Sequence, residues 1–107
     1  MARENVFQAG LKQELRQLFP GCVILKNDPE FERGIPDLLI LWRHRWAALE
    51  CKRDKFADRS AAQTYFVEKM NRMSFAAFIY PENKDTILND LQLAFGAKRP
   101  ARISKPE

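Results

Sequence analysis

The feature that most constrains the fold is an unbroken apolar run, residues 38–42, that directly follows Asp37. A strand without a polar residue is typical of a sheet that is covered on both faces, so we expect helices on both sides of this strand. The run is far shorter than the roughly 20 residues that a membrane span needs. A short basic turn over residues 43–45 leads to a second strand over residues 46–52, and the two strands form a predicted hairpin.

Helical and strand patterns alternate along the rest of the chain. Phe7, Leu11 and Leu15 recur every four residues on one face of a helix, which Pro20 ends. In chain order we predict a helix over residues 4–19, strands over 22–25, 38–42 and 46–52, a helix from residue 60, a strand over 75–80 and a last helix before Gly96. The apolar side of the helix from residue 60 carries Ala62, Tyr65, Phe66, Met70 and Met73. This α-β-β-β-α-β-α order predicts a single α/β domain over residues 1–97.

The positive charge of the chain is concentrated near its end. Of the formal net charge of +4, residues 98–107 supply four basic residues against one acid, so residues 1–97 are close to neutral. The same segment contains two prolines and one large apolar residue, which predicts a flexible basic tail. A basic tail permits a nucleic-acid partner, because Lys and Arg neutralise backbone phosphate.

The chain has two cysteines and one histidine, so metal binding or catalysis by these residue types has few candidates. Cys22 and Cys51 lack the spacing of zinc ligands, and His44 is the only histidine, which argues against a structural zinc site and against Ser-His or Cys-His catalysis. The sequence opens on charged residues rather than on an apolar stretch, so we expect a cytoplasmic protein.

Charged residues occupy positions where the pattern predicts core. Asp37 begins the apolar strand, and on the next strand a period of two puts Glu50 and Lys52 on one face. Burying such groups costs several kcal/mol unless they are paired or bind a metal. A plain salt bridge between Glu50 and Lys52 at a strand end would explain two of these three charged residues. The second acid, Asp37, favours a cation instead, because two converging carboxylates repel each other without one.

Strand pairing provides a test of this convergence. In an antiparallel hairpin, opposed residues share a face, so Asp37 joins Glu50 and Lys52 only if the numbers of opposed residues have an odd sum. That requires a bulge or a turn with an even number of residues, such as a two-residue turn at His44-Arg45. A regular three-residue turn over residues 43–45 would put Asp37 on the other face. The sequence would then indicate a small α/β interaction domain with an ordinary salt bridge at a strand end.

Two predicted helices supply further candidates. Glu4 lies close to the apolar stripe of the first helix, where it either joins the carboxylates or caps the first turn through the helix dipole. Glu14, at the edge of the same stripe, is the alternative acid on this helix. Gln63 falls in the first turn of the next helix, capped by Asp58 or Ser60, and is either a site residue or an ordinary exposed glutamine.

These residues together resemble a known family. Gly34-Ile35-Pro36-Asp37, then Glu50-Cys51-Lys52, with Gln63 on the following helix and Glu4 on the first, is similar to the PD-(D/E)XK nuclease superfamily. More narrowly, the pattern resembles the virus-type replication-repair nuclease (VRR-NUC) group in its small, stand-alone phage form. The resemblance implies a restriction-endonuclease-like domain, in which helices flank a mixed central sheet.

The resemblance also implies roles for the individual residues. Asp37, Glu50 and the backbone carbonyl of Cys51 would bind Mg²⁺ or Mn²⁺, with Glu4 as a possible further ligand. Lys52 would be the catalytic lysine, which orients water or offsets negative charge on the phosphate. The glutamine that the family carries on the helix after the lysine strand matches Gln63, which would steady the lysine or the scissile phosphate.

The implied activity is metal-dependent hydrolysis of DNA. Among the activities found in the family we favour a homodimeric Holliday-junction resolvase that acts on branched DNA, because one catalytic centre makes one cut and a junction needs two. Candidate dimer surfaces are the Trp42-Trp46 end of the hairpin, unless both aromatics are core, and the exposed side of the last helix. A flap or fork nuclease and a catalytically inactive DNA-binding module are the alternatives. The resemblance further implies a phage gene that acts in DNA repair or recombination, without a membrane or a small-molecule cofactor.

Overall fold

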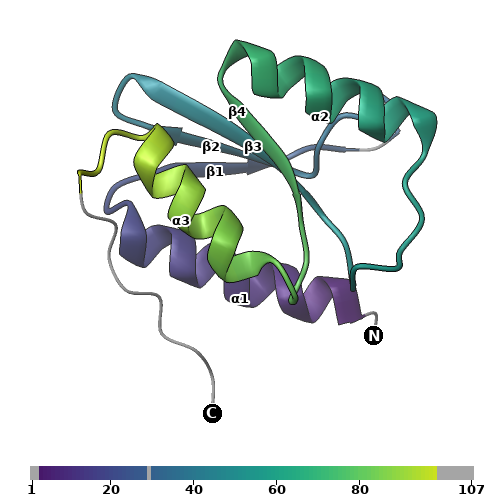
Figure 1. Cartoon of the computed structure of the whole chain (residues 1–107), viewed down its shortest axis with the longest axis horizontal. Helices are drawn as coiled ribbons and strands as arrows, with labels where there is room; N and C mark the ends of the chain where they lie inside the picture. The colour runs from purple at the N-terminus through teal and green to yellow at the C-terminus, as the bar shows by residue number, and fades with distance from the viewer. Residues whose placement is uncertain (1–2, 29, 99–107) are drawn as a thin grey trace.

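The computed structural model describes residues 3–28 and 30–98 and has the predicted order of elements (Figure 1). The elements are α1 (Arg3–Leu18), β1 (Val23–Lys26), β2 (Leu38–Trp42), β3 (Arg45–Cys51), α2 (Ala61–Met73), β4 (Phe75–Ile79) and α3 (Lys84–Ala94). Beyond Lys98, the predicted tail lies outside the described residues, and so does the side chain of Glu4. Within the described ranges, no helix combines the length and the apolar character that a bilayer crossing requires.

The four strands form one mixed sheet in the order β1-β2-β3-β4. β1 and β2 are antiparallel, as are β2 and β3, whereas β4 lies parallel to β3. The hairpin turn is Arg43-His44, since Trp42 opposes Arg45. The turn therefore starts one residue earlier than predicted but still has two residues, so opposed residues have an odd sum, as the test required.

α1 and α3 cover one face of the sheet, and α2 lies on the other (Figure 1). Alternation along the strands directs Leu38, Ile40 and Leu49 toward α1 and α3, where they are fully buried. Leu15 of α1 and Leu88 of α3 are equally inaccessible in the same cluster. This face holds the main hydrophobic core.

α2 covers only part of its face, because it packs over β3 and β4. The prediction that residues 38–42 are covered on both faces is therefore wrong for the far end of β2, where Leu41 is 37% exposed. The predicted apolar side of the helix is also displaced. Tyr65 and Met73 are exposed, whereas Val67 is buried against the sheet.

The two tryptophans of the hairpin belong to the two packed clusters. The Trp42 ring lies 5.1 Å from that of Phe19 and 6.0 Å from that of Phe95, measured between centroids, and its Nε1 donates to the carbonyl of Pro20 at 2.9 Å. Trp46 packs against the smaller cluster beneath α2. Of the two predicted dimer surfaces, the hairpin end is thus occupied by internal contacts.

Candidate active site

Asp37 and Glu50 meet where β2 begins and β3 ends. Leu38 opposes Leu49, so extending the same register by one residue places Asp37 opposite Glu50, on the face that carries α2. The Asp37 Oδ2 atom accepts a hydrogen bond from the backbone N–H of Cys51 at 2.9 Å. One carboxylate is thereby fixed at the strand end that carries the other.

Gln63 joins the acid to the base. Its Oε1 accepts from the Nζ of Lys52 at 2.9 Å, while its Nε2 donates to Oε2 of Glu50 at 3.2 Å. Among the described residues, Glu50 and Lys52 are thus linked through this amide, and not by a direct ion pair within 4 Å. Both the plain salt bridge and the ordinary exposed glutamine are therefore wrong. We name Asp37, Glu50, Lys52 and Gln63 the polar network.

Glu50 and Lys52 are the buried members of the network, which makes their hydrogen bonds costly to lose. Glu50 is 5% exposed and Lys52 9%. An ammonium removed from water costs several kcal/mol unless its protons are accepted, and the Gln63 carbonyl oxygen accepts one of them. The hydrogen bond to Gln63 therefore orients the Lys52 side chain and offsets part of the cost of burying it.

The first turn of α2 holds Gln63 in place. Ser60 is the N-cap, and its Oγ accepts from the N–H of Gln63 at 3.1 Å, while its own N–H donates to Gln63 Oε1 at 3.0 Å. This is a complete capping box, in which serine and glutamine satisfy each other's free backbone N–H groups. Gln63 therefore starts the helix and links the charges at once.

Asn27 anchors the approach to Asp37 and was missed from the sequence. Its backbone N–H donates to the carbonyl of Asp37 at 2.8 Å, and its Nδ2 donates to the carbonyl of Pro36 at 2.7 Å. The loop that brings Asp37 to the sheet is therefore tied to the end of β1. The only sequence signal was an Asn placed just after a strand, which is common in loops generally.

Glu14 does not belong to the network. Its Oε1 accepts from the Nζ of Lys84 at 2.7 Å, which pairs α1 with the start of α3. Its Oε2 is buried without a hydrogen-bond partner among the described residues. Whether Glu4 or Glu14 is the acid of the first helix therefore stays a prediction. The helix that carries Glu4 is formed from Arg3 onward, and the role of its side chain stays a prediction.

The donor set suits a hard divalent cation. Asp37 and Glu50 are the two carboxylates that the strand register brings to this place. Among the described residues, no group of three or more His, Cys, Asp or Glu could hold a metal. Mg²⁺ is usually held by one or two carboxylates, with waters and substrate phosphates in its other positions. Two carboxylates at adjacent strand ends, followed directly by the Cys51 carbonyl, fit that ion.

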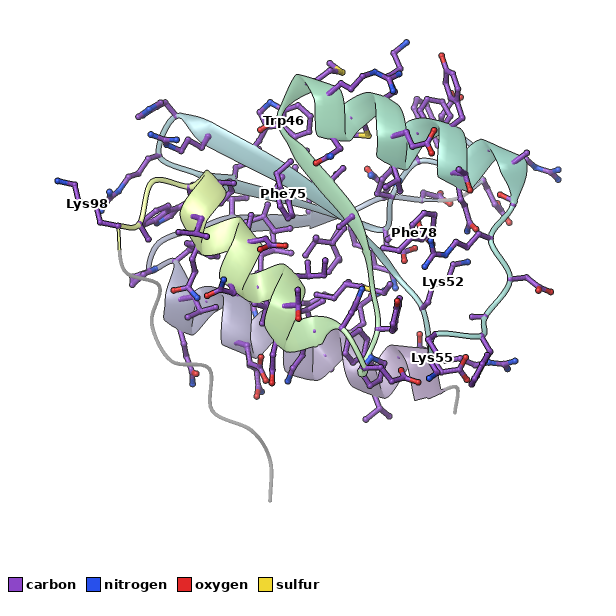
Figure 2. All side chains as sticks on the ribbon, in the orientation of Figure 1. Trp46, Lys52, Lys55, Phe75, Phe78 and Lys98 are labelled. Atoms are coloured by element: carbon purple, nitrogen blue, oxygen red, sulfur yellow. The ribbon has the colours of Figure 1, made fainter. Side chains whose placement is uncertain are left out.

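Exposed basic residues surround the network in sequence. The residues are Lys26, Arg33, Arg53, Lys55 and Arg59, and all are exposed. The Arg59 guanidinium lies 4.1 Å from the centroid of the Phe78 ring, next to Glu50 in the sheet register. Figure 2 shows Lys52 and Lys55 at one end of the molecule and Lys98, the start of the tail, at the other. The basic loops, and not Lys98, flank the candidate site.

The fold matches a known domain. No known family model and no curated protein matches the chain. A solved structure described as a "VRR_NUC domain" is similar to it, with 25% sequence identity and a TM-score of 0.62. The match covers 75% of this chain and 85% of the other. The chain therefore has a VRR-NUC nuclease fold of the restriction-endonuclease-like class, and this fold supports a nuclease-type function.

Proposed function

We propose that the protein is a metal-dependent, structure-specific DNA endonuclease, and that it acts as a homodimeric Holliday-junction resolvase. The observation that carries the proposal is the polar network, in which Gln63 links a buried lysine to Glu50 and the Cys51 N–H holds Asp37 at the same end of the sheet. Buried charges are weak evidence for a stabilising role, since apolar residues of similar volume often stabilise a fold as well. Their retention favours a chemical role.

The acidic end of the network would hold the cation. Asp37, Glu50 and the Cys51 carbonyl would bind Mg²⁺ or Mn²⁺, with Glu4 as a direct or water-mediated ligand. When bound, such an ion lowers the pKa of a water molecule and offsets charge on the phosphate. The hydrogen bond from the Cys51 N–H to Asp37 Oδ2 orients that carboxylate, so the protein supplies a prepared oxygen donor.

Lys52 would act on the reacting phosphate. Its Nζ has three protons and gives one to Gln63, which leaves donors for the attacking water or a phosphate oxygen. A positive charge held at low dielectric stabilises developing negative charge more strongly than one in water. The amide of Gln63 holds the ammonium and the Glu50 carboxylate in one hydrogen-bonded unit.

Resolution of a four-way junction needs two centres. Each chain carries one polar network and would therefore cut one strand, so paired symmetric cuts require a two-fold dimer. A flap or fork needs one cut only and could be served by a monomer. The number and symmetry of the cuts therefore separate the resolvase from the other nucleases of this fold.

The test is cleavage of labelled DNA by the purified protein in Mg²⁺. We expect symmetric paired nicks in a four-way junction, no cleavage in excess EDTA, and little cutting of flap, single-stranded or linear duplex DNA. Asp37→Ala and Lys52→Ala should each lower cleavage by about a thousandfold or more while DNA binding persists. Glu68→Ala, which removes an exposed acid on α2, is the matched control and should cleave normally.

Four outcomes would contradict the proposal. Full activity in EDTA would exclude the cation, and full activity of either variant would exclude the assigned residues. Cleavage of flaps alone would leave a nuclease but remove the resolvase. DNA binding without cleavage of any substrate would identify a catalytically inactive binding module.

A further inference from the structure

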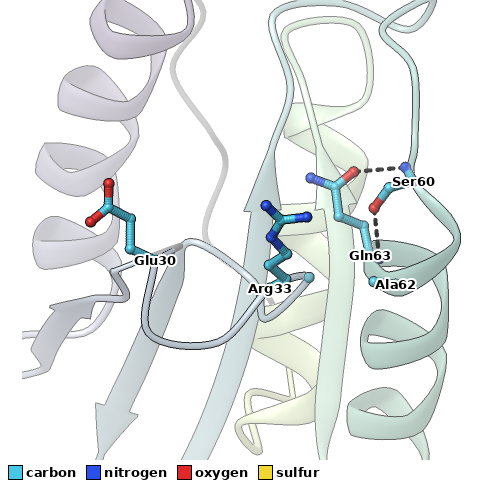
Figure 3. Close-up of a pocket in the computed structure, with 6 residues that line it drawn as sticks. Glu30, Arg33, Ser60, Ala62 and Gln63 are labelled. Carbon is cyan, nitrogen blue, oxygen red and sulfur yellow. Dashed lines mark hydrogen bonds between the residues drawn. The ribbon is translucent and has the colours of Figure 1, made fainter.

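A cavity of about 630 Å³ lies next to the polar network and is not used by it (Figure 3). Its walls are the loop before Asp37 and the first turn of α2. The lining residues are Glu30, Arg33, Gly34, Ser60, Ala62 and Gln63. Gln63 belongs both to this cavity and to the network, so a ligand in the cavity would be one residue away from Lys52, which Gln63 holds.

Arg33 is the charged donor that the cavity leaves available. The Gln63 amide is already engaged with Glu50, Lys52 and the Ser60 N–H. Within the described part of the chain, the Arg33 guanidinium forms no ion pair within 4 Å. In Figure 3 its side chain lies between Glu30 and Gln63. The cavity thus offers a guanidinium without an ion-pair partner next to the polar network.

Gly34 brings the loop that carries Arg33 against α2. Its φ of +87° lies in the left-handed region, and a Cβ built on it would lie 2.6 Å from the Cβ of Ala62 and 2.7 Å from its carbonyl carbon. No other residue satisfies both the backbone angle and the contact, since real Cβ atoms do not approach that closely. The loop therefore sits directly on the first turn of α2, and the residue before Gly34 is positioned with it.

We infer that the cavity binds a backbone phosphate of the DNA strand next to the scissile phosphate, with Arg33 as its contact. The inference rests on the proposed nuclease function. A guanidinium presents paired N–H groups that match two phosphate oxygens, which makes arginine suited to hold a strand in one register. Glu30 repels phosphate, so the strand passes on the Arg33 side, toward Gln63 and Lys52. Arg33 is accordingly a positioning residue, which decides which phosphate reaches the network.

The test combines loss of the arginine with loss of a single phosphate charge. DNA that the wild-type protein cuts is made with one methylphosphonate, a neutral replacement, at each position around the cut in turn. One position adjacent to the cut should slow wild-type cleavage by about tenfold to a hundredfold. Arg33→Ala should slow cleavage of unmodified DNA to a similar extent, and the same methylphosphonate should then have no further effect. Arg33→Lys should recover part of the rate.

Arg72→Ala is the matched control, because it removes the same exposed charge from the last turn of α2, at the other end of the helix. It should keep the full methylphosphonate effect. If the effects of Arg33→Ala and of every methylphosphonate simply multiply, Arg33 contacts no phosphate near the cut and the inference is wrong, while the nuclease proposal stands. If the wild-type protein cuts no DNA, the proposed function and this inference fail together.

Discussion

The two faces of the sheet differ in what they bury. Beneath α1 and α3 lie large apolar side chains, among them Leu38, Ile40 and Leu49, all with no accessible surface. Beneath α2 the buried strand residues include small ones, Ala48 and Ala76. The first face is sealed along the sheet, whereas α2 closes only the β3 and β4 side of the second.

The difference assigns most of the stability of the domain to one face of the sheet and the candidate active site to the other. Hydrophobic burial scales with the apolar area removed from water, so most of the folding free energy comes from the sealed face. The α2 face buries charge as well as apolar area, because Glu50 and Lys52 are only 5% and 9% exposed there. Burying these charges costs free energy. The α2 face can hold them because the other face stabilises the domain. Variants on the two faces should therefore change different quantities.

The largest expected change in stability comes from the sealed face. Leu88→Ala, in the middle of α3, should lower the free energy of unfolding by about 2–5 kcal/mol, because it removes a fully buried side chain and leaves a cavity. Urea denaturation measures this loss. Leu93→Ala on the same helix, where the side chain is 48% exposed, should change it by less than about 0.5 kcal/mol.

Cleavage per folded molecule should be unchanged by Leu88→Ala at a temperature where the variant is folded. A fall in the cleavage rate at full folding would contradict the separation, because it would mean that the core beneath α3 adjusts the geometry of the network across the sheet.

The next largest effect is expected at Gln63, which both caps α2 and links Glu50 to Lys52. Gln63→Ala removes the bonds to Glu50 and Lys52 and half of the capping box, so cleavage should fall by about tenfold to a hundredfold, as for other residues that orient reactive groups. Ser60→Ala breaks the other half of the box and leaves those two bonds. It should cost about 0.5–2 kcal/mol of stability, as loss of an N-cap does, but much less activity. Equal losses of activity in the two variants would show that Gln63 acts only by capping α2.

Local patterns were enough to predict the elements and the shared face of Glu50 and Lys52. The hairpin, the three helices and the alternation of Glu50 and Lys52 follow from spacings of two to four residues. The side of the sheet on which Asp37 lies depends on turn length, so it could be stated only as a test. The actual turn includes Arg43 at φ +58°, a conformation uncommon outside glycine, which no residue type signalled.

What could not be predicted depends on contacts between distant segments. Which strands α2 covers is decided by packing, so the exposure of Leu41 was not foreseen. The pairing of Glu14 with Lys84 links residues 70 positions apart, and the two hydrogen bonds of Asn27 join the end of β1 to the start of β2. The cavity at Arg33 depends on an approach of Gly34 to Ala62, which exists only once the loop meets α2.

The smallest change in monomer stability is expected on the uncovered part of the α2 face. Val23 and Leu25 of β1 and Leu41 of β2 are 50%, 46% and 37% exposed, and they lie together because Val23 opposes Leu41. Among the described strands, β1 pairs only with β2, so its outer edge is open. An open edge beside apolar side chains suits pairing with a second copy about a two-fold axis, as the proposed dimer requires.

Leu25→Lys should therefore change the unfolding free energy of the monomer by less than about 0.5 kcal/mol, since the side chain is already half exposed. In sedimentation equilibrium the same variant should shift the dimer to monomer, because a charge at a two-fold contact faces its own copy. Junction DNA should then receive single nicks in place of paired ones. Leu93→Lys places the same charge on α3, the other candidate surface, and should leave the dimer intact. The reverse pattern would move the interface to α3, and a wild-type monomer that still makes paired nicks would show that the two cuts do not need a stable dimer.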